Sequence, residues 1–174
     1  MVITISGKSG CGNSTVSRLV AERLGLRHIN FTLRDLARER GLSFEQLWER
    51  AQYDQSVDHD LDHRLMDLAA GGGCVLGTRL AIWLIEDQDL SIYLEATQQT
   101  RAARIASREA MSYGAALAAT DQRDRRDRNR YLRLYDIDID DASQADVVVD
   151  TEDLDEHAVA GKIIEALRTR NLFD

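Results

Sequence analysis

The feature that most constrains the fold is a glycine-rich segment near the N-terminus, residues 7–14, with the sequence GKSGCGNS. The sequence VITIS before it, residues 2–6, predicts a short buried strand. After it, apolar side chains recur at helical spacing as far as Gly25, which predicts a helix that ends there. Backbone N–H groups in such a loop, together with the positive end of the following helix, bind phosphate oxygens. The order strand, glycine loop, helix therefore predicts a phosphate-binding loop.

This loop has the length and the glycine positions of the Walker A motif, G-x-x-x-x-G-K-[ST], which binds ATP phosphates. We therefore predict an ATP site formed by Gly7, Lys8, Gly10, Cys11, Gly12, Asn13, Ser14 and Thr15. Ser14 takes the position whose hydroxyl binds Mg²⁺. Asn13 takes the position of the motif's lysine and removes a full charge, which Lys8 is a candidate to replace. Two alternatives are a plain glycine turn and a loop that binds nucleotide but catalyses poorly.

Predicted strands and helices alternate along the rest of the chain. Further strands are predicted at residues 74–77, 90–94 and 146–150, with a shorter one near 28–30. This alternation is typical of a parallel sheet covered by helices on both faces. We predict a three-layer α/β/α P-loop domain over residues 1–174, with a mostly parallel five-stranded sheet.

One helical region interrupts this pattern at about residues 31–70. Within it, the sequence SFEQ at residues 43–46 has the spacing of a capping box and predicts the start of a helix. We predict that this region is a helical insertion that binds the phosphate acceptor.

A second helical region, about residues 112–136, contains the arginine-rich sequence DQRDRRDRNRYLRLY. On a helix, Arg123, Arg126, Asp127 and Arg130 share one face. A solvated face with internal ion pairs and a nucleic-acid surface are two interpretations. A third is a helical lid, whose arginines stabilise the charge on a transferred phosphoryl group. Next to a phosphate-binding loop, the lid interpretation is favoured.

The overall charge limits the partners of the chain. Its formal net charge is -8, which argues against general binding to nucleic acid or to an anionic membrane. No apolar run approaches the roughly 18 residues that a membrane span requires, and the N-terminus does not have the pattern of a signal peptide. We therefore expect a cytoplasmic protein, either a monomer or a dimer.

Taken together, the phosphate loop and the arginine-rich segment resemble those of the cytidylate kinases, especially the archaeal-type branch of these nucleoside-monophosphate kinases. The resemblance extends over nearly the whole chain, through ITISGKSGCGNSTVSRLVAERLGL, VDHDLDHRL, VLGTRLAIW and RDRRDRNRYLRLYDIDIDD. It implies a kinase that uses ATP and Mg²⁺ to convert CMP or dCMP into CDP or dCDP.

The resemblance also implies roles for individual residues. Arg123 and Arg130 correspond to lid arginines that contact substrate phosphates, and Asp127 to an acid that contacts the sugar of the acceptor. Arg126, which shares their helical face, is predicted to be catalytic with them. The remaining predicted acceptor-binding residues are Arg34, Asp62 and Arg79. No aspartate ends the strand at 74–77, so Mg²⁺ binding is expected to depend on Ser14, the phosphates and water.

Two other functions remain open from the sequence. One is a different small-molecule kinase of the same fold, acting on another nucleotide, shikimate or dephospho-coenzyme A. The other is a regulatory protein that binds nucleotide without catalysis, because Asn13 replaces the lysine of the loop.

Overall fold

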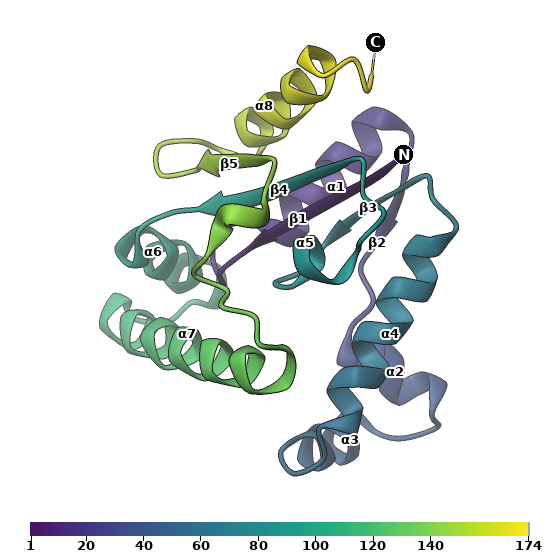
Figure 1. Cartoon of the computed structure of the whole chain (residues 1–174). Helices are drawn as coiled ribbons and strands as arrows, with labels where there is room; N and C mark the ends of the chain where they lie inside the picture. The colour runs from purple at the N-terminus through teal and green to yellow at the C-terminus, as the bar shows by residue number, and fades with distance from the viewer. Residues whose placement is uncertain (174) are drawn as a thin grey trace.

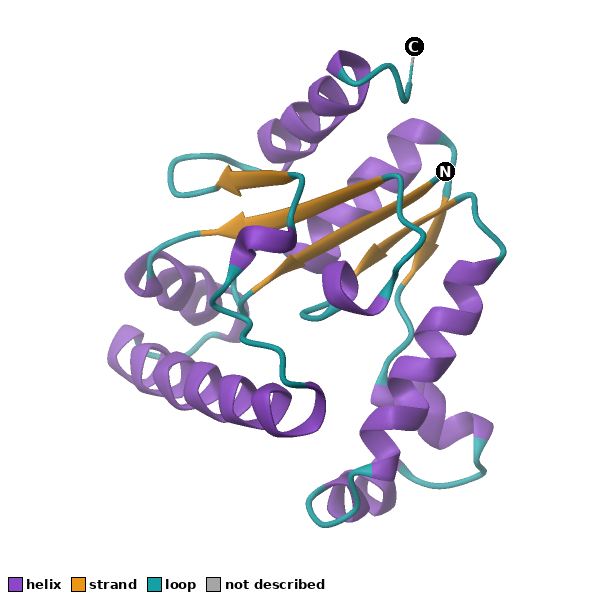
Figure 2. Cartoon of the chain, in the orientation of Figure 1, coloured by secondary structure: helices purple, strands orange, loops and turns teal. Residues whose placement is uncertain are grey.

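Five parallel strands form one sheet in the order β2-β3-β1-β4-β5. The computed structural model describes residues 1–173. It places the strands at Val2–Gly7 (β1), Arg27–Ile29 (β2), Cys74–Gly77 (β3), Leu90–Glu95 (β4) and Val147–Asp150 (β5). All five predicted strands are confirmed, and the sheet, predicted as mostly parallel, is entirely parallel. Figure 2 shows the arrowheads of the strands ending on the side of the molecule where the phosphate loop leaves β1.

Side chains of β1 alternate between the two faces of the sheet, as the strand geometry requires. Ile3 and Ile5 belong to a core shared with α1 (Asn13–Leu24) and α8 (Glu156–Thr169). Val2 belongs to a second core, which contains residues of α4 (Ser56–Ala70) and α5 (Ala81–Leu84). Helices thus cover both faces, which confirms the three-layer α/β/α arrangement (Figure 1).

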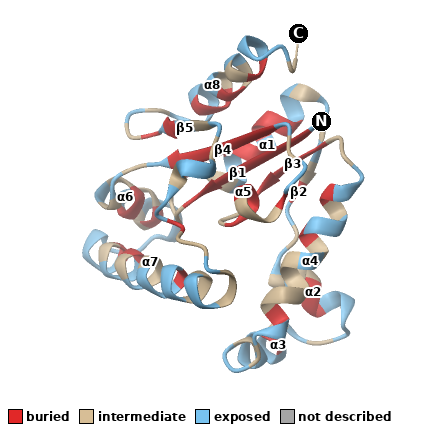
Figure 3. Ribbon diagram, viewed as in Figure 1, coloured by how far each residue is buried: buried red, intermediate tan, exposed pale blue. Residues whose placement is uncertain are grey.

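The predicted helical insertion consists of α2 (Leu33–Glu39), α3 (Phe44–Ala51) and the long helix α4. Capping boxes start the first two helices, at Thr32 and at Ser43, and the second confirms the prediction from SFEQ. The insertion has a small core of its own, formed by Leu36, Ala37, Leu47 and Val57. In Figure 3, α2 and α3 show mainly exposed and intermediate residues, whereas the central strands are buried.

The predicted lid is a single helix, α7 (Tyr113–Tyr135), which Ser112 caps at its start and Asp136 at its end. It packs along α6 (Gln98–Glu109) through Ala102, Ile105 and Ala116. After α7 the chain returns past β4 through a 3₁₀ turn, Ala142–Gln144, to reach β5. None of the helices within residues 1–173 is both long enough and apolar enough to cross a membrane.

Candidate active site

The glycine loop lies between β1 and α1 and packs closely against α6. Gly10 has a φ of 91°, in the left-handed region that favours glycine. A Cβ atom at this position would lie 2.8 Å from the Cβ atom of Arg101 on α6. The contact leaves no room for a side chain, so the path of the loop depends on glycine here.

Asn13, at the lysine position of the motif, closes the loop without adding charge. Its Nδ2 donates a hydrogen bond to the carbonyl oxygen of Gly7 at 2.5 Å. Its Oδ1 is buried and has no hydrogen-bond partner. The side chain therefore fixes the two ends of the loop relative to each other and supplies no cation.

Two adjoining cavities open along the loop. The larger, of about 660 Å³, lies between the loop, α6 and the segment after β5. The smaller, of about 290 Å³, lies between the loop and the end of β3, and Asn13 and Ser14 line it. Both are lined by Gly10, Gly12, Thr15 and Arg108. The two cavities are therefore neighbours; the larger has room for a nucleoside and the smaller for a chain of phosphates.

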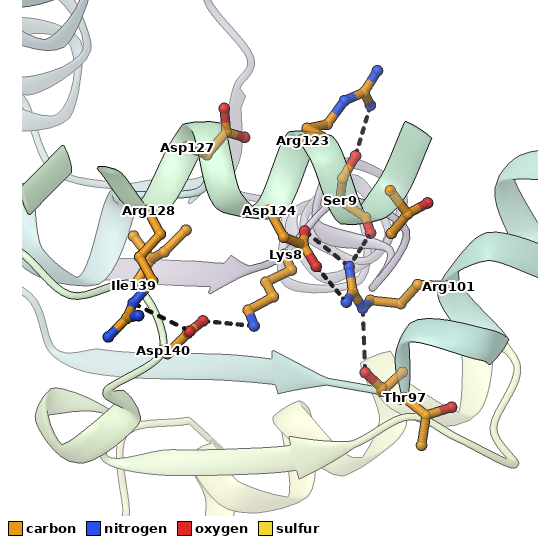
Figure 4. Close-up of polar contacts among 12 residues, drawn as sticks. Lys8, Ser9, Thr97, Arg101, Arg123, Asp124, Asp127, Arg128, Ile139 and Asp140 are labelled. Atoms are coloured by element: carbon orange, nitrogen blue, oxygen red, sulfur yellow. Dashed lines mark hydrogen bonds and ion pairs between the residues drawn. The ribbon is translucent and has the colours of Figure 1, made fainter. Parts of the chain in front are cut away.

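Lys8, the candidate for the missing charge, is paired with a carboxylate. Its Nζ lies 2.5 Å from Oδ1 of Asp140, in the segment that follows α7 (Figure 4). Asp140 in turn lies 3.4 Å from the guanidinium of Arg128 on α7. Arg128 also pairs with Asp138 at 2.6 Å and lowers the pKa of that carboxyl to about 2. Through this chain of ion pairs, Lys8 connects the loop to α7.

Two of the predicted acceptor-binding residues, Arg79 and Asp127, form an ion pair. Arg79 lies just beyond β3 and lines the smaller cavity. Its Nε lies 3.2 Å from Oδ2 of Asp127 on α7, a carboxylate whose side chain is only 6% exposed. Arg126 approaches the other oxygen of Asp127 at 3.5 Å and is otherwise largely exposed. The structure therefore brings the end of β3 and the lid helix together over the loop.

The lid arginines have different partners. Arg123 donates a hydrogen bond of 2.9 Å to Oγ of Ser9 in the loop (Figure 4). Arg130 instead forms an ion pair with Asp58 of α4. One lid arginine thus contacts the phosphate loop, and another contacts the helical insertion.

A second contact between α4 and α7 involves Asp62. The hydroxyl of Tyr135 donates a hydrogen bond of 2.5 Å to Oδ2 of Asp62. Burial raises the pKa of Asp62 to about 6, although this hydrogen bond acts in the opposite direction. Next to this contact a third cavity, of about 430 Å³, lies between Asp58 and the arginines of α7. Polar side chains therefore connect α4 and α7, and a cavity lies beside these contacts.

Comparison with known proteins assigns the chain to a family. The sequence profile of the Cytidylate kinase-like family matches residues 2–153. The chain belongs to the cytidylate kinase-like family. It is 43% identical over 176 residues to Cytidylate kinase 2 of Borreliella afzelii, with 99% of each chain covered. It is 38% identical to the cytidylate kinase of Pyrococcus horikoshii, over 87% of this chain and 80% of the relative.

Solved structures extend this comparison to the fold. The shikimate kinase of Acinetobacter baumannii superimposes with a TM-score of 0.66 at 17% identity, with 99% of this chain and 95% of that chain covered. The deoxyadenosine kinase of M. mycoides superimposes with a TM-score of 0.60 at 19% identity, over 97% and 100% of the two chains. At these identities the likeness shows that this cytidylate kinase-like chain has the fold of the P-loop kinases.

Two arginines of α6 contact the glycine loop or line the larger cavity, and neither was predicted from the sequence. Arg101 is 3% exposed, donates to the carbonyl oxygen of Ser9 at 3.1 Å and pairs with Asp124 at 2.7 Å. Arg104 donates to Oγ1 of Thr151 at 3.0 Å and lines the larger cavity. Their spacing along the helix, which continues to Arg108, was the available signal, because it places three arginines on one face.

Two other predicted site residues, Arg34 and Cys11, pack against neighbouring protein groups. Arg34 does not reach the Arg79–Asp127 pair; its guanidinium lies over the ring of Phe44, 4.3 Å from the ring centre. Its predicted contact with the acceptor stays a prediction. Cys11 is buried in the loop, and burial raises its pKa to about 11. The neutral thiol packs within the loop and is a poor nucleophile.

Proposed function

We propose that this chain is a cytidylate kinase, which transfers the γ-phosphoryl group of ATP to CMP or dCMP and yields ADP with CDP or dCDP. The observation that carries the proposal is the Arg79–Asp127 pair, because it joins the lid helix to the cavity at the phosphate loop. Relatives named cytidylate kinases match the chain over almost its full length, which supports the same function.

ATP supplies the phosphoryl group for this reaction, and Mg²⁺ neutralises part of the phosphate charge. The residues of the site fit both. Loop residues between Lys8 and Thr15 line part of a cavity of about 290 Å³, and three cationic side chains belong to the same lining. The Ser14 hydroxyl lines the same cavity and is suited to a Mg²⁺ ligand.

The acceptor phosphate is the nucleophile and is already ionised at neutral pH, so the reaction requires no general base. One of its oxygens bonds to the γ-phosphorus of ATP while the bond to the bridging oxygen breaks and ADP leaves. Arg123, Arg126 and Arg130 offset the charge that develops during this exchange. Arg130 must leave Asp58 to do so, and the incoming phosphate offers it a stronger partner.

For the acceptor, the proposed contacts are Arg34, Asp62, Arg79 and Asp127. We propose that Asp127, which is buried and paired with Arg79, accepts hydrogen bonds from the sugar hydroxyl groups of the acceptor. We further infer that the protein acts in the cytoplasm on small molecules, without a nucleic-acid or membrane partner, as a monomer or a dimer.

The test is ADP production with Mg·ATP in the presence of CMP, dCMP, UMP or AMP, each compared with ATP alone. We expect fast turnover with CMP or dCMP. Turnover with a different acceptor would support a kinase activity but contradict CMP or dCMP as the substrate. Asn13 motivates one alternative, a nucleotide-binding regulatory protein; ATP binding without turnover on any acceptor would support it.

A further inference from the structure

The cavity at the phosphate loop is positively charged even though Asn13 replaces the lysine of the motif. Its described lining includes three cationic side chains, Lys8, Arg79 and Arg108, and no carboxylate. A lysine at position 13 would neutralise the terminal phosphates of ATP. One of these three cations is therefore the candidate to take over that task.

Lys8 and Arg79 are engaged elsewhere in the structure. Lys8 Nζ lies 2.5 Å from a carboxylate oxygen of Asp140. Arg79 lies 3.2 Å from Asp127, which is almost fully buried. Removing Arg79 from this pair would leave a buried carboxylate with less compensation, which is costly. Each of these two cations would therefore have to break an ion pair in order to contact ATP.

Arg108, in the last turn of α6, has the weakest partner of the three. It pairs with the adjacent Glu109 at 2.7 Å, and the two side chains are 61% and 43% exposed. Exposed pairs of this kind contribute little, so the guanidinium is released at small cost. Its exposure also leaves it free to change rotamer without disturbing a core.

Arg108 is also the one cation of the three that lines both the larger and the smaller cavity. It therefore borders both the cavity with room for a nucleoside and the cavity with room for phosphates. The helix that carries it is fixed to the loop, because Arg101 donates to the carbonyl oxygen of Ser9. This attachment gives Arg108 a constant position relative to the phosphates.

We propose that Arg108 supplies the positive charge that Asn13 does not, and that its guanidinium binds the terminal phosphates of ATP. The charge of the Walker A lysine is thereby moved from the loop to the end of α6, while the Asn13 side chain donates a hydrogen bond to the carbonyl oxygen of Gly7. The inference rests on the proposed function for ATP as the ligand, and it goes beyond it by assigning the residue that replaces the lysine.

The test is a double-mutant cycle on nucleotide binding, with Arg108→Ala, Asn13→Lys and the double variant. The dissociation constant of Mg²⁺ with a non-hydrolysable ATP analogue is measured by calorimetry. We expect R108A to weaken binding about tenfold, because a charge-assisted contact with phosphate is lost. N13K should restore most of this loss in the R108A background and change the parent protein by less than about threefold. Arg108→Lys should retain most of the affinity.

Arg125→Ala is the matched control, because Arg125 is an exposed arginine of α7 that pairs with Asp121 within its own helix. It should leave the dissociation constant unchanged. If N13K strengthens binding by the same factor with and without Arg108, the two positions are independent and the proposal is wrong. It is also wrong if Lys8→Met, and not R108A, shows the loss that N13K restores.

The binding cycle keeps this inference separate from the proposed function. A protein that phosphorylates neither CMP nor dCMP would overturn the proposed function, whereas coupling between positions 13 and 108 would still support the role of Arg108. Conversely, active CMP phosphorylation without coupling would overturn only the role of Arg108.

Discussion

The two halves of the candidate site are built in different ways. On the nucleotide side, glycines of the loop are in close contact with α6, and the buried Arg101 donates a hydrogen bond to the carbonyl oxygen of Ser9. On the acceptor side, the helices α4 and α7 meet through the side-chain pairs Arg130–Asp58 and Tyr135–Asp62. Close packing holds the nucleotide side in place, whereas the acceptor side is held by polar side-chain pairs that a ligand can displace.

This difference indicates how the two substrates are recognised. In the proposed function, the triphosphate binds N–H groups whose positions are set by the fold, so we expect little rearrangement on binding. In the same proposal, the acceptor phosphate replaces Asp58 as the anionic partner of Arg130. We therefore expect substitutions on the nucleotide side to damage the site itself and substitutions on the acceptor side to change affinity and turnover.

The largest effect is expected for Gly10→Ala. The residue has a φ of 91°, and the added Cβ atom would lie 2.8 Å from Cβ of Arg101 and 2.9 Å from its carbonyl oxygen. The loop must shift, and kcat/KM for ATP should fall about 100-fold. The control is Gly72→Ala, which has a φ of 62° but open space around it and should cost about 1 kcal/mol of stability without changing kcat/KM. Equal effects of both variants would contradict the close-contact argument.

A smaller effect is expected for Arg130→Ala on the acceptor side. The variant removes a cation that offsets charge during transfer, so kcat should fall about tenfold or more while the melting temperature changes little. Steady-state kinetics with CMP and a thermal melt provide the two measurements. Near-normal turnover in the folded variant would show that Arg130 has no catalytic role.

Asp58→Asn sharpens the comparison further, because it removes the competing anion without removing Arg130. We expect KM for CMP to decrease about threefold, in line with the modest strength of a partly exposed ion pair. Asp60→Asn is the control, since Asp60 lies on the same helix but pairs with Arg40 of the insertion. An increased KM for CMP in D58N would mean that Asp58 contacts the acceptor itself.

The smallest effect concerns the pH dependence of stability through Asp62. Its folded pKa of about 6 is above the ordinary value of 3.8, so the folded protein holds this proton more tightly than the unfolded chain does. The stabilisation is fully present below pH 3.8 and is lost as the pH rises through about 6. The melting-temperature difference between the parent protein and Asp62→Asn should therefore fall by roughly 4 °C from pH 4 to pH 7. A constant difference would show that Asp62 titrates normally.

The sequence predicted those parts of the fold that local patterns specify. Strands such as residues 2–6 and 90–94 are short, mainly apolar segments, and the cap at Ser43 depends on residues three positions apart. The strand order could not be derived in this way. The burial of Arg101 was also not predicted, because its partner Asp124 lies 23 residues later on another helix.

Within the candidate site, the sequence indicated individual residues but not how their side chains pair. Arg79 and Asp127 were predicted separately for the acceptor, and the fold joins them over the smaller cavity. Arg34 was predicted from its place in a segment, but its direction depends on the packing of α2 against α3, where Phe44 receives it. Such contacts are set by tertiary packing, which no local pattern encodes.

The pairing of Lys8 with Asp140 has a practical consequence for spectroscopy. The chain contains only two lysines, Lys8 in the loop and Lys162 on α8. Carbon-13 methylation of the side-chain amines would therefore give two lysine resonances, one of which arises beside the phosphate site. Its chemical shift would report in real time when the contact with Asp140 breaks, without any engineered label.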